Sequence, residues 1–273
     1  MPSLTSHAHT QDLCQHSSRR TPSSPGRLRR TRLLLPLASL AVLALALAAS
    51  RATPGFRHWL IITATTIAGA AAGALIRWLL ARIPRGTTVK PGICEFTIAL
   101  LWSLIAYQWT TGHIAPGWLP SAFLFTCFAT ALTMTDLHHR RLPNALTIPA
   151  YPITAACITV AALSTDNPAT LWQAATGATL FLTLHAAVHL LRPTALGAGD
   201  VKLSGPLGAI LGAVHLAALP IAAVLAAGVT VLLATATPRD VRSRWQSGIP
   251  HGPGLLAATT LFVIFGGAPL TSL

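Results

Sequence analysis

Three observations predict an all-α, polytopic transmembrane helical bundle of about eight or nine helices with a cytoplasmic N-terminus. Of the 273 residues, 52% are hydrophobic and only 9% are charged, whereas a soluble domain carries about 25% charged residues. The apolar residues form runs close to the ~20 residues that a helix needs to cross a bilayer. Lys and Arg lie mostly between those runs, as in membrane proteins that obey the positive-inside rule.

The first 50 residues contain two predicted elements. Residues 1–32 are polar and rich in Ser, Thr, His, Pro and Arg, which predicts a disordered basic cytoplasmic tail. The apolar run 33–50 follows several arginines and predicts a signal anchor or extra transmembrane helix. A cleaved signal peptide is the alternative, because the small residues Ala46, Ala48 and Ala49 resemble a cleavage site.

Residues 59–270 are predicted to form the main membrane domain. A lipid-exposed backbone must satisfy its own hydrogen bonds, so each apolar run is expected to be helical. The run 203–236 is too long for one span and contains Gly208, Gly212 and Pro220, which predicts a short re-entrant helix followed by a full one. The runs are 59–81, 95–110, 118–135, 145–163, 170–191, 203–236 and 253–270.

Charge asymmetry gives the expected orientation. If the N-terminal tail is cytoplasmic and the chain alternates across the membrane, only Arg51 and Arg57 of the 19 Lys and Arg residues lie outside. This count uses the split of run 203–236 into two helices. The positive-inside rule therefore explains the net charge of +13, and no nucleic-acid partner is needed. The chain is expected in the plasma membrane, in contact with membrane lipids.

Only six acidic residues are available for acid–base chemistry. Asp12, Asp166 and Asp240 lie in polar segments, and Glu95 opens a predicted helix, where a carboxylate complements the helix dipole. Asp136 ends one apolar run and Asp200 precedes another, both at the predicted cytoplasmic face. Ionisable residues near hydrocarbon are functional candidates by default.

Two carboxylates in a poorly solvated site share a proton, so a neutral acid and a carboxylate base coexist. Such a pair can activate water against a peptide carbonyl. Gly197 and Gly199 next to Asp200 would let the backbone bend and a substrate approach. The alternative is interfacial ion pairing, of Asp136 with Arg140 and of Asp200 with Lys202 or Arg192.

The segment Gly197-Ala-Gly-Asp-Val-Lys-Leu203, preceded by Asp136-x5-Leu-Pro143-Asn144, resembles the type IV prepilin peptidases, which are GxGD membrane aspartyl proteases. Three shorter segments extend this resemblance over residues 66–260. They are Gly69-x3-Gly73 with the following Arg82-Ile-Pro-Arg-Gly86, Cys94-Glu95-Phe96, and Ile249-Pro250-His251-Gly252-Pro253.

The resemblance implies that Asp136 and Asp200 form a catalytic dyad, with Lys202 positioning or supporting Asp200. It implies prepilin-like or pseudopilin precursors as substrates, cleaved at the cytoplasmic face after a glycine. Gly197, Gly199, Pro143 and Asn144 belong to the same motifs. Glu95, Pro250, Gly252 and Pro253 are weaker site candidates.

This chain also departs from the family pattern. Many members carry two C-x-x-C pairs, associated with methylation of the product, between their first two helices. Residues 83–93 contain no such pair, so the resemblance carries no expectation of methyltransferase activity. His251 replaces a family Phe, and the segment 33–50 is an addition ahead of the family's first helix.

Two other functions are alternatives to prepilin cleavage. A transporter or channel that couples protons or cations through Asp136 and Asp200 would favour acids near the bilayer midplane and an inverted repeat, and the sequence indicates neither. A presenilin-like GxGD protease would carry Pro-Ala-Leu near the second Asp, whereas this chain has Ala268-Pro-Leu270 at its end. No spacing indicates a metal site, and no cofactor is expected.

Overall fold

The computed structural model describes residues 54–83, 87–139, 143–193, 196–237 and 251–266, and these residues are all helical or in connecting turns. The all-α prediction is confirmed. The predicted tail at 1–32 and the signal anchor at 33–50 lie outside the described residues. The helices are α2 (Pro54–Leu80), α3 (Ile93–Thr110), α4 (Leu119–His139), α5 (Asn144–Ser164), α6 (Ala169–Leu191), α7 (Ala198–Val214), α8 (Ala218–Ala236) and α10 (Gly252–Phe265), with a 3₁₀ turn at Pro116–Trp118.

Within the part of the chain that the structure describes, five segments are long and apolar enough to cross a membrane. They are Gly55–Leu80, Pro116–His138, Asn144–Ser164, Ala169–Leu191 and Ala218–Ala236. The first four agree to within a few residues with a run predicted from the sequence, and Ala218–Ala236 is the second part of run 203–236. Hydrophobic length is the main determinant of a spanning helix. The protein is therefore a multi-pass membrane protein.

The predicted split of run 203–236 into a short helix followed by a full one is confirmed, but the chain breaks at neither Gly208 nor Gly212. The helix α7 continues through Gly208 and Gly212, and the chain breaks only at residues 215–217, before α8. These glycines allow close packing instead. A Cβ at Gly212 would lie 2.9 Å from the Cα of Gly177 in α6, and one at Gly208 would overlap the Gly177 carbonyl oxygen. Small residues let two apolar helices approach closely in this way.

The glycines of α2 serve the same purpose. A Cβ at Gly69 would lie 2.9 Å from the Cα of Ala99, and one at Gly73 would lie 2.5 Å from the Cα of Glu95. Both neighbours belong to α3. The Gly69-x3-Gly73 pattern is therefore the contact surface between α2 and α3.

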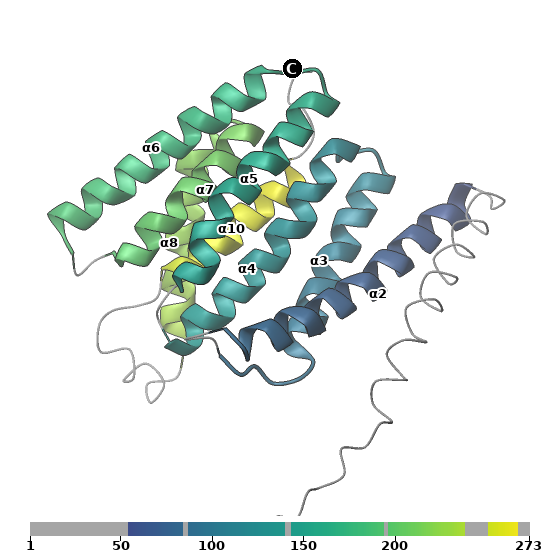
Figure 1. Ribbon diagram of the computed structural model, residues 1–273, viewed down its shortest axis with the longest axis horizontal. Helices are drawn as coiled ribbons and strands as arrows, with labels where there is room; N and C mark the ends of the chain where they lie inside the picture. The colour runs from purple at the N-terminus through teal and green to yellow at the C-terminus, as the bar shows by residue number, and fades with distance from the viewer. Residues whose placement is uncertain (1–53, 84–86, 140–142, 194–195, 238–250, 267–273) are drawn as a thin grey trace, which may run out of the picture. The chain divides into compact units, whose positions relative to one another are not determined.

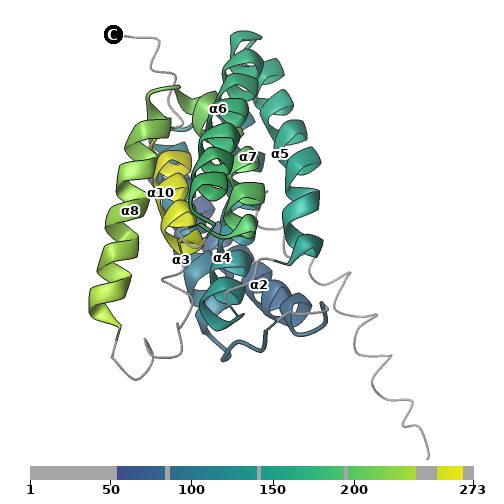
Figure 2. The same cartoon turned by 90° about the vertical axis from the view of Figure 1, so that its left-hand side faces the viewer.

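The core of the bundle is built around α10. This helix contacts α3, α4, α7 and α8, and most of its residues are buried. Figures 1 and 2 show it as the yellow helix enclosed by its neighbours. The C-terminal ends of α4, α6 and α8 and the N-terminal ends of α5, α7 and α10 lie together at the lower left of Figure 1. This end of the bundle, called the dyad end below, carries both Asp136 and Asp200.

Candidate active site

The carboxylates of Asp136 and Asp200 converge on Gly252. Asp136 lies near the C-terminal end of α4, and Asp200 lies in the first turn of α7. A Cβ built on Gly252, the first residue of α10, would lie 2.6 Å from Asp136 Oδ2 and 3.1 Å from Asp200 Oδ1. The separation of these two oxygens therefore cannot exceed the sum of the two distances. The structure brings the two predicted catalytic residues together.

Both acids are withdrawn from solvent to different degrees. The Asp136 residue is 6% exposed, and Asp200 is half-buried. Burial raises the pKa of the Asp200 carboxyl to about 6, although a backbone hydrogen bond from Gly197 opposes this rise. A carboxyl group in this range holds or releases a proton near neutral pH, as general acid–base chemistry requires.

His251 directly precedes Gly252 in the chain, and its side chain is held by Thr230. The Thr230 hydroxyl donates to the Ala226 carbonyl oxygen over 2.7 Å, and the same Oγ1 lies 3.0 Å from His251 Nδ1. Because the single hydroxyl hydrogen is used on Ala226, the imidazole Nδ1–H is the donor to Thr230. Burial and the neighbouring His185 lower the pKa of His251, which favours the neutral ring.

Lys202 contacts the other motif rather than Asp200. Its Nζ donates to Asn144 Oδ1 over 3.2 Å. Among the described residues, neither Lys202 nor Arg192 forms an ion pair with Asp200. Direct electrostatic support of Asp200 by Lys202 is therefore not seen, and ion pairing does not account for this acid. Arg140, the predicted partner of Asp136, lies outside the described residues.

The remaining motif residues have local structural roles. Pro143 is buried, and its carbonyl accepts a hydrogen bond of 2.9 Å from the Leu146 N–H in the first turn of α5. Gly197 caps α7 with φ −71° and ψ 146°, a conformation open to any residue, so the expected glycine-specific bend is absent there. Gly199 follows inside the same helix, and Pro253 is buried in the first turn of α10. Pro250 lies outside the described residues.

Glu95 is bound between α2 and α3. Its Oε1 accepts a hydrogen bond of 2.7 Å from Arg77 Nε, and its Oε2 accepts one of 2.9 Å from the backbone N–H of Gly92. Gly92 has φ 96°, in the left-handed region that favours glycine. Both carboxylate oxygens thus have partners, which indicates a structural role in starting α3.

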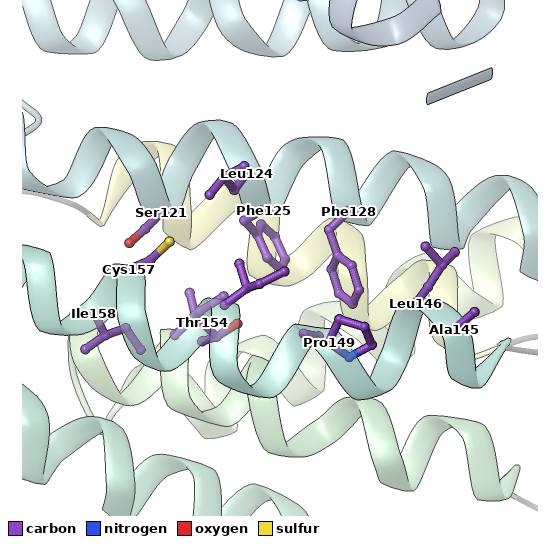
Figure 3. A pocket seen from close by; sticks show the side chains of 13 residues that line it. Ser121, Leu124, Phe125, Phe128, Ala145, Leu146, Pro149, Thr154, Cys157 and Ile158 are labelled. Carbon is purple, nitrogen blue, oxygen red and sulfur yellow. The ribbon is translucent and has the colours of Figure 1, made fainter. Parts of the chain in front are cut away.

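An apolar cavity of about 160 Å³ lies between α4 and α5. Figure 3 shows Phe125 and Phe128 of α4 facing Thr154 and Pro149 of α5 across it. Neither dyad acid lines it. Within the described residues, Ser121 Oγ is a buried side-chain oxygen with no hydrogen-bond partner. Because neither Asp136 nor Asp200 lines the cavity, it is separate from the candidate active site.

Tyr151 was not identified from the sequence. Its hydroxyl donates to the Lys202 carbonyl oxygen over 2.7 Å, which links α5 to α7 two residues after Asp200. A lone Tyr within an apolar run has no pattern that reveals such a contact. Thr230 was missed for the same reason, since its partner His251 is distant in the sequence.

Among the described residues, no group of three or more His, Cys, Asp or Glu side chains is placed to hold a metal ion. The model of the type IV leader peptidase family matches residues 123–235, which include Asp136 and Asp200. No curated protein and no solved structure gave a significant match. The match over residues 123–235 supports a similarity to the type IV leader peptidase family and a protease role.

Proposed function

We propose that this protein is an aspartic endopeptidase that removes the leader from type IV prepilin-like precursors at the cytoplasmic face of the membrane. The observation that carries the proposal is the convergence of Asp136 and Asp200 on Gly252. Both acids lie inside the segment that matches a leader peptidase family. The matched family indicates the class of substrate, and the geometry indicates which two carboxyl groups act together.

The two acids have complementary roles in this proposal. Asp200 holds its proton to a higher pH than an ordinary Asp does and donates it to the carbonyl oxygen of the scissile peptide. Asp136 takes a proton from water, and the resulting hydroxide attacks the carbonyl carbon. The tetrahedral intermediate then collapses as Asp136 passes the proton it took from water to the leaving amine, and Asp200 recovers its proton from the hydroxyl group of the intermediate. No covalent bond to the enzyme forms.

The charge distribution supports a cytoplasmic site. Arg57 lies near the start of α2. The other described Lys and Arg residues lie at the dyad end of the bundle, either near the ends of helices or in the connections between them. The positive-inside rule assigns the more basic end to the cytoplasm. The other basic residues are Arg77, Arg82, Lys90, Arg192 and Lys202.

Co-expression with a prepilin-type precursor tests the function. We expect the full-length protein to convert the precursor to a shorter product whose new N-terminus follows the leader glycine, as read by mass spectrometry. An inert precursor in the presence of membrane-inserted protein, under conditions where an authentic prepilin peptidase cleaves it, would contradict the proposal.

A further inference from the structure

Pro206 leaves a gap in the hydrogen bonding of α7. The helix runs through this proline from Ala198 to Val214. In a regular α-helix, the carbonyl of Lys202 would accept a hydrogen bond from the N–H of residue 206. Proline has no N–H, so the Lys202 carbonyl oxygen lacks this partner. The gap falls two residues after Asp200.

Tyr151 fills this gap from the neighbouring helix. Its hydroxyl donates to the Lys202 carbonyl oxygen over 2.7 Å. Gly205 provides the space for the ring, because a Cβ there would lie 2.5 Å from the Tyr151 hydroxyl oxygen and 2.8 Å from Cε1. Pro206 frees the acceptor, Gly205 admits the ring, and Tyr151 supplies the donor.

A second contact ties the same residue to α5. Lys202 Nζ donates to Asn144 Oδ1 over 3.2 Å, and Asn144 is the first residue of α5. Lys202 is thus bound to α5 through both its backbone and its side chain. The helix α5 follows α4 closely in the chain and packs against it. These contacts therefore fix the position of the first turn of α7 relative to α4, the helix that carries Asp136.

We propose that Tyr151 is a positioning residue, which holds the first turn of α7 against α5 and so sets Asp200 at its working distance from Asp136. This inference rests on the proposed function for its kinetic consequences. Tyr151 does not act on the substrate itself. Its contribution passes through the Lys202 carbonyl, so it affects the chemical step more than substrate binding.

The first test is Tyr151→Phe in the full-length protein. Removal of the hydroxyl should lower kcat for prepilin cleavage by about tenfold, since small misplacements of catalytic groups are costly. The KM should stay unchanged. The matched control is Tyr107→Phe, because Tyr107 is the only other tyrosine of the chain and its side chain is exposed. This control should keep the wild-type kcat.

The second test restores the missing donor by another route. In Tyr151→Phe/Pro206→Ala, the new backbone N–H of residue 206 can bond the Lys202 carbonyl. The double variant should therefore have a higher kcat than Tyr151→Phe alone, and the two substitutions should be non-additive. A general loss of packing caused by Tyr151→Phe would not be rescued by a substitution at Pro206.

Amide hydrogen exchange separates this inference from the proposed function. Exchange at residues 200–204 should be faster in Tyr151→Phe than in wild type and slower again in the double variant, whether or not the protein cleaves prepilins. An inactive wild type would overturn the proposed function alone. Unchanged exchange in Tyr151→Phe, or a double variant as impaired as Tyr151→Phe, would overturn the role of Tyr151.

Discussion

The carboxylates of Asp136 and Asp200 meet over Gly252, because only a residue without a Cβ leaves room for both at the start of α10. The three residues come from three helices that are far apart in the chain, and α10 contacts both of the other two in the bundle. Gly252 is therefore part of the candidate active site, because both carboxylates lie against it, and this contact requires glycine at the start of α10.

Gly252→Ala should impair cleavage strongly. The new methyl group would lie 2.6 Å from Asp136 Oδ2, so at least one carboxylate must move. A displacement of about 1 Å costs up to about 100-fold in rate, and we expect a loss of kcat of that order. The control is Gly228→Ala in α8, where a Cβ would meet nothing within 4 Å. Equal activity of the two variants would contradict the role of Gly252.

Asp200→Asn should stabilise the protein at neutral pH. The pKa of Asp200 rises from 3.8 to about 6 on folding, so the folded state binds a proton more tightly than the unfolded chain. The free energy of unfolding therefore falls as pH rises through this window, by up to about 3 kcal/mol. Asn carries no charge, so the melting temperature of the Asp200→Asn variant should exceed that of wild type at pH 7. The difference between the two melting temperatures should be smaller at pH 4. An equal difference in melting temperature at pH 7 and pH 4 would contradict the raised pKa of Asp200.

Glu95→Gln should leave catalysis intact. Glu95 bonds Arg77 and the N–H of Gly92, and neither contact reaches the dyad. The Arg77–Glu95 pair is half-buried, and ion pairs at the protein surface contribute about 0.2–1 kcal/mol, so we expect a small fall in melting temperature with wild-type kcat. A loss of cleavage comparable to that of the dyad variants would give Glu95 a catalytic role instead.

The orientation can be tested with two matched cysteine variants. Thr88 lies at the dyad end and Thr111 beyond the other end of α3, and both are exposed. In a background without the four native cysteines, a membrane-impermeant thiol reagent added to intact cells should label Thr111→Cys and spare Thr88→Cys. The reverse pattern would place the dyad outside the cell.

The positions of most helices could be predicted because they depend on hydrophobic length, which is a local property of the sequence. Asp136 and Asp200 could be singled out because acids are scarce and both interrupt apolar sequence. The roles of Gly208 and Gly212 could not be predicted, because glycine can either interrupt a helix or let two helices pack closely. The contacts of Tyr151 and Lys202 join distant segments, and no spacing in the sequence encodes them.

The catalytic role of the two acids is tested by comparing prepilin cleavage by wild type, Asp136→Asn and Asp200→Asn, each purified from membranes at matched amounts. Asn keeps the size of each side chain and removes the acid–base group, a type of contribution worth about 100–10,000-fold. We predict that mass spectrometry finds the released leader with wild type and essentially none with either variant. Wild-type rates in either variant would contradict the dyad.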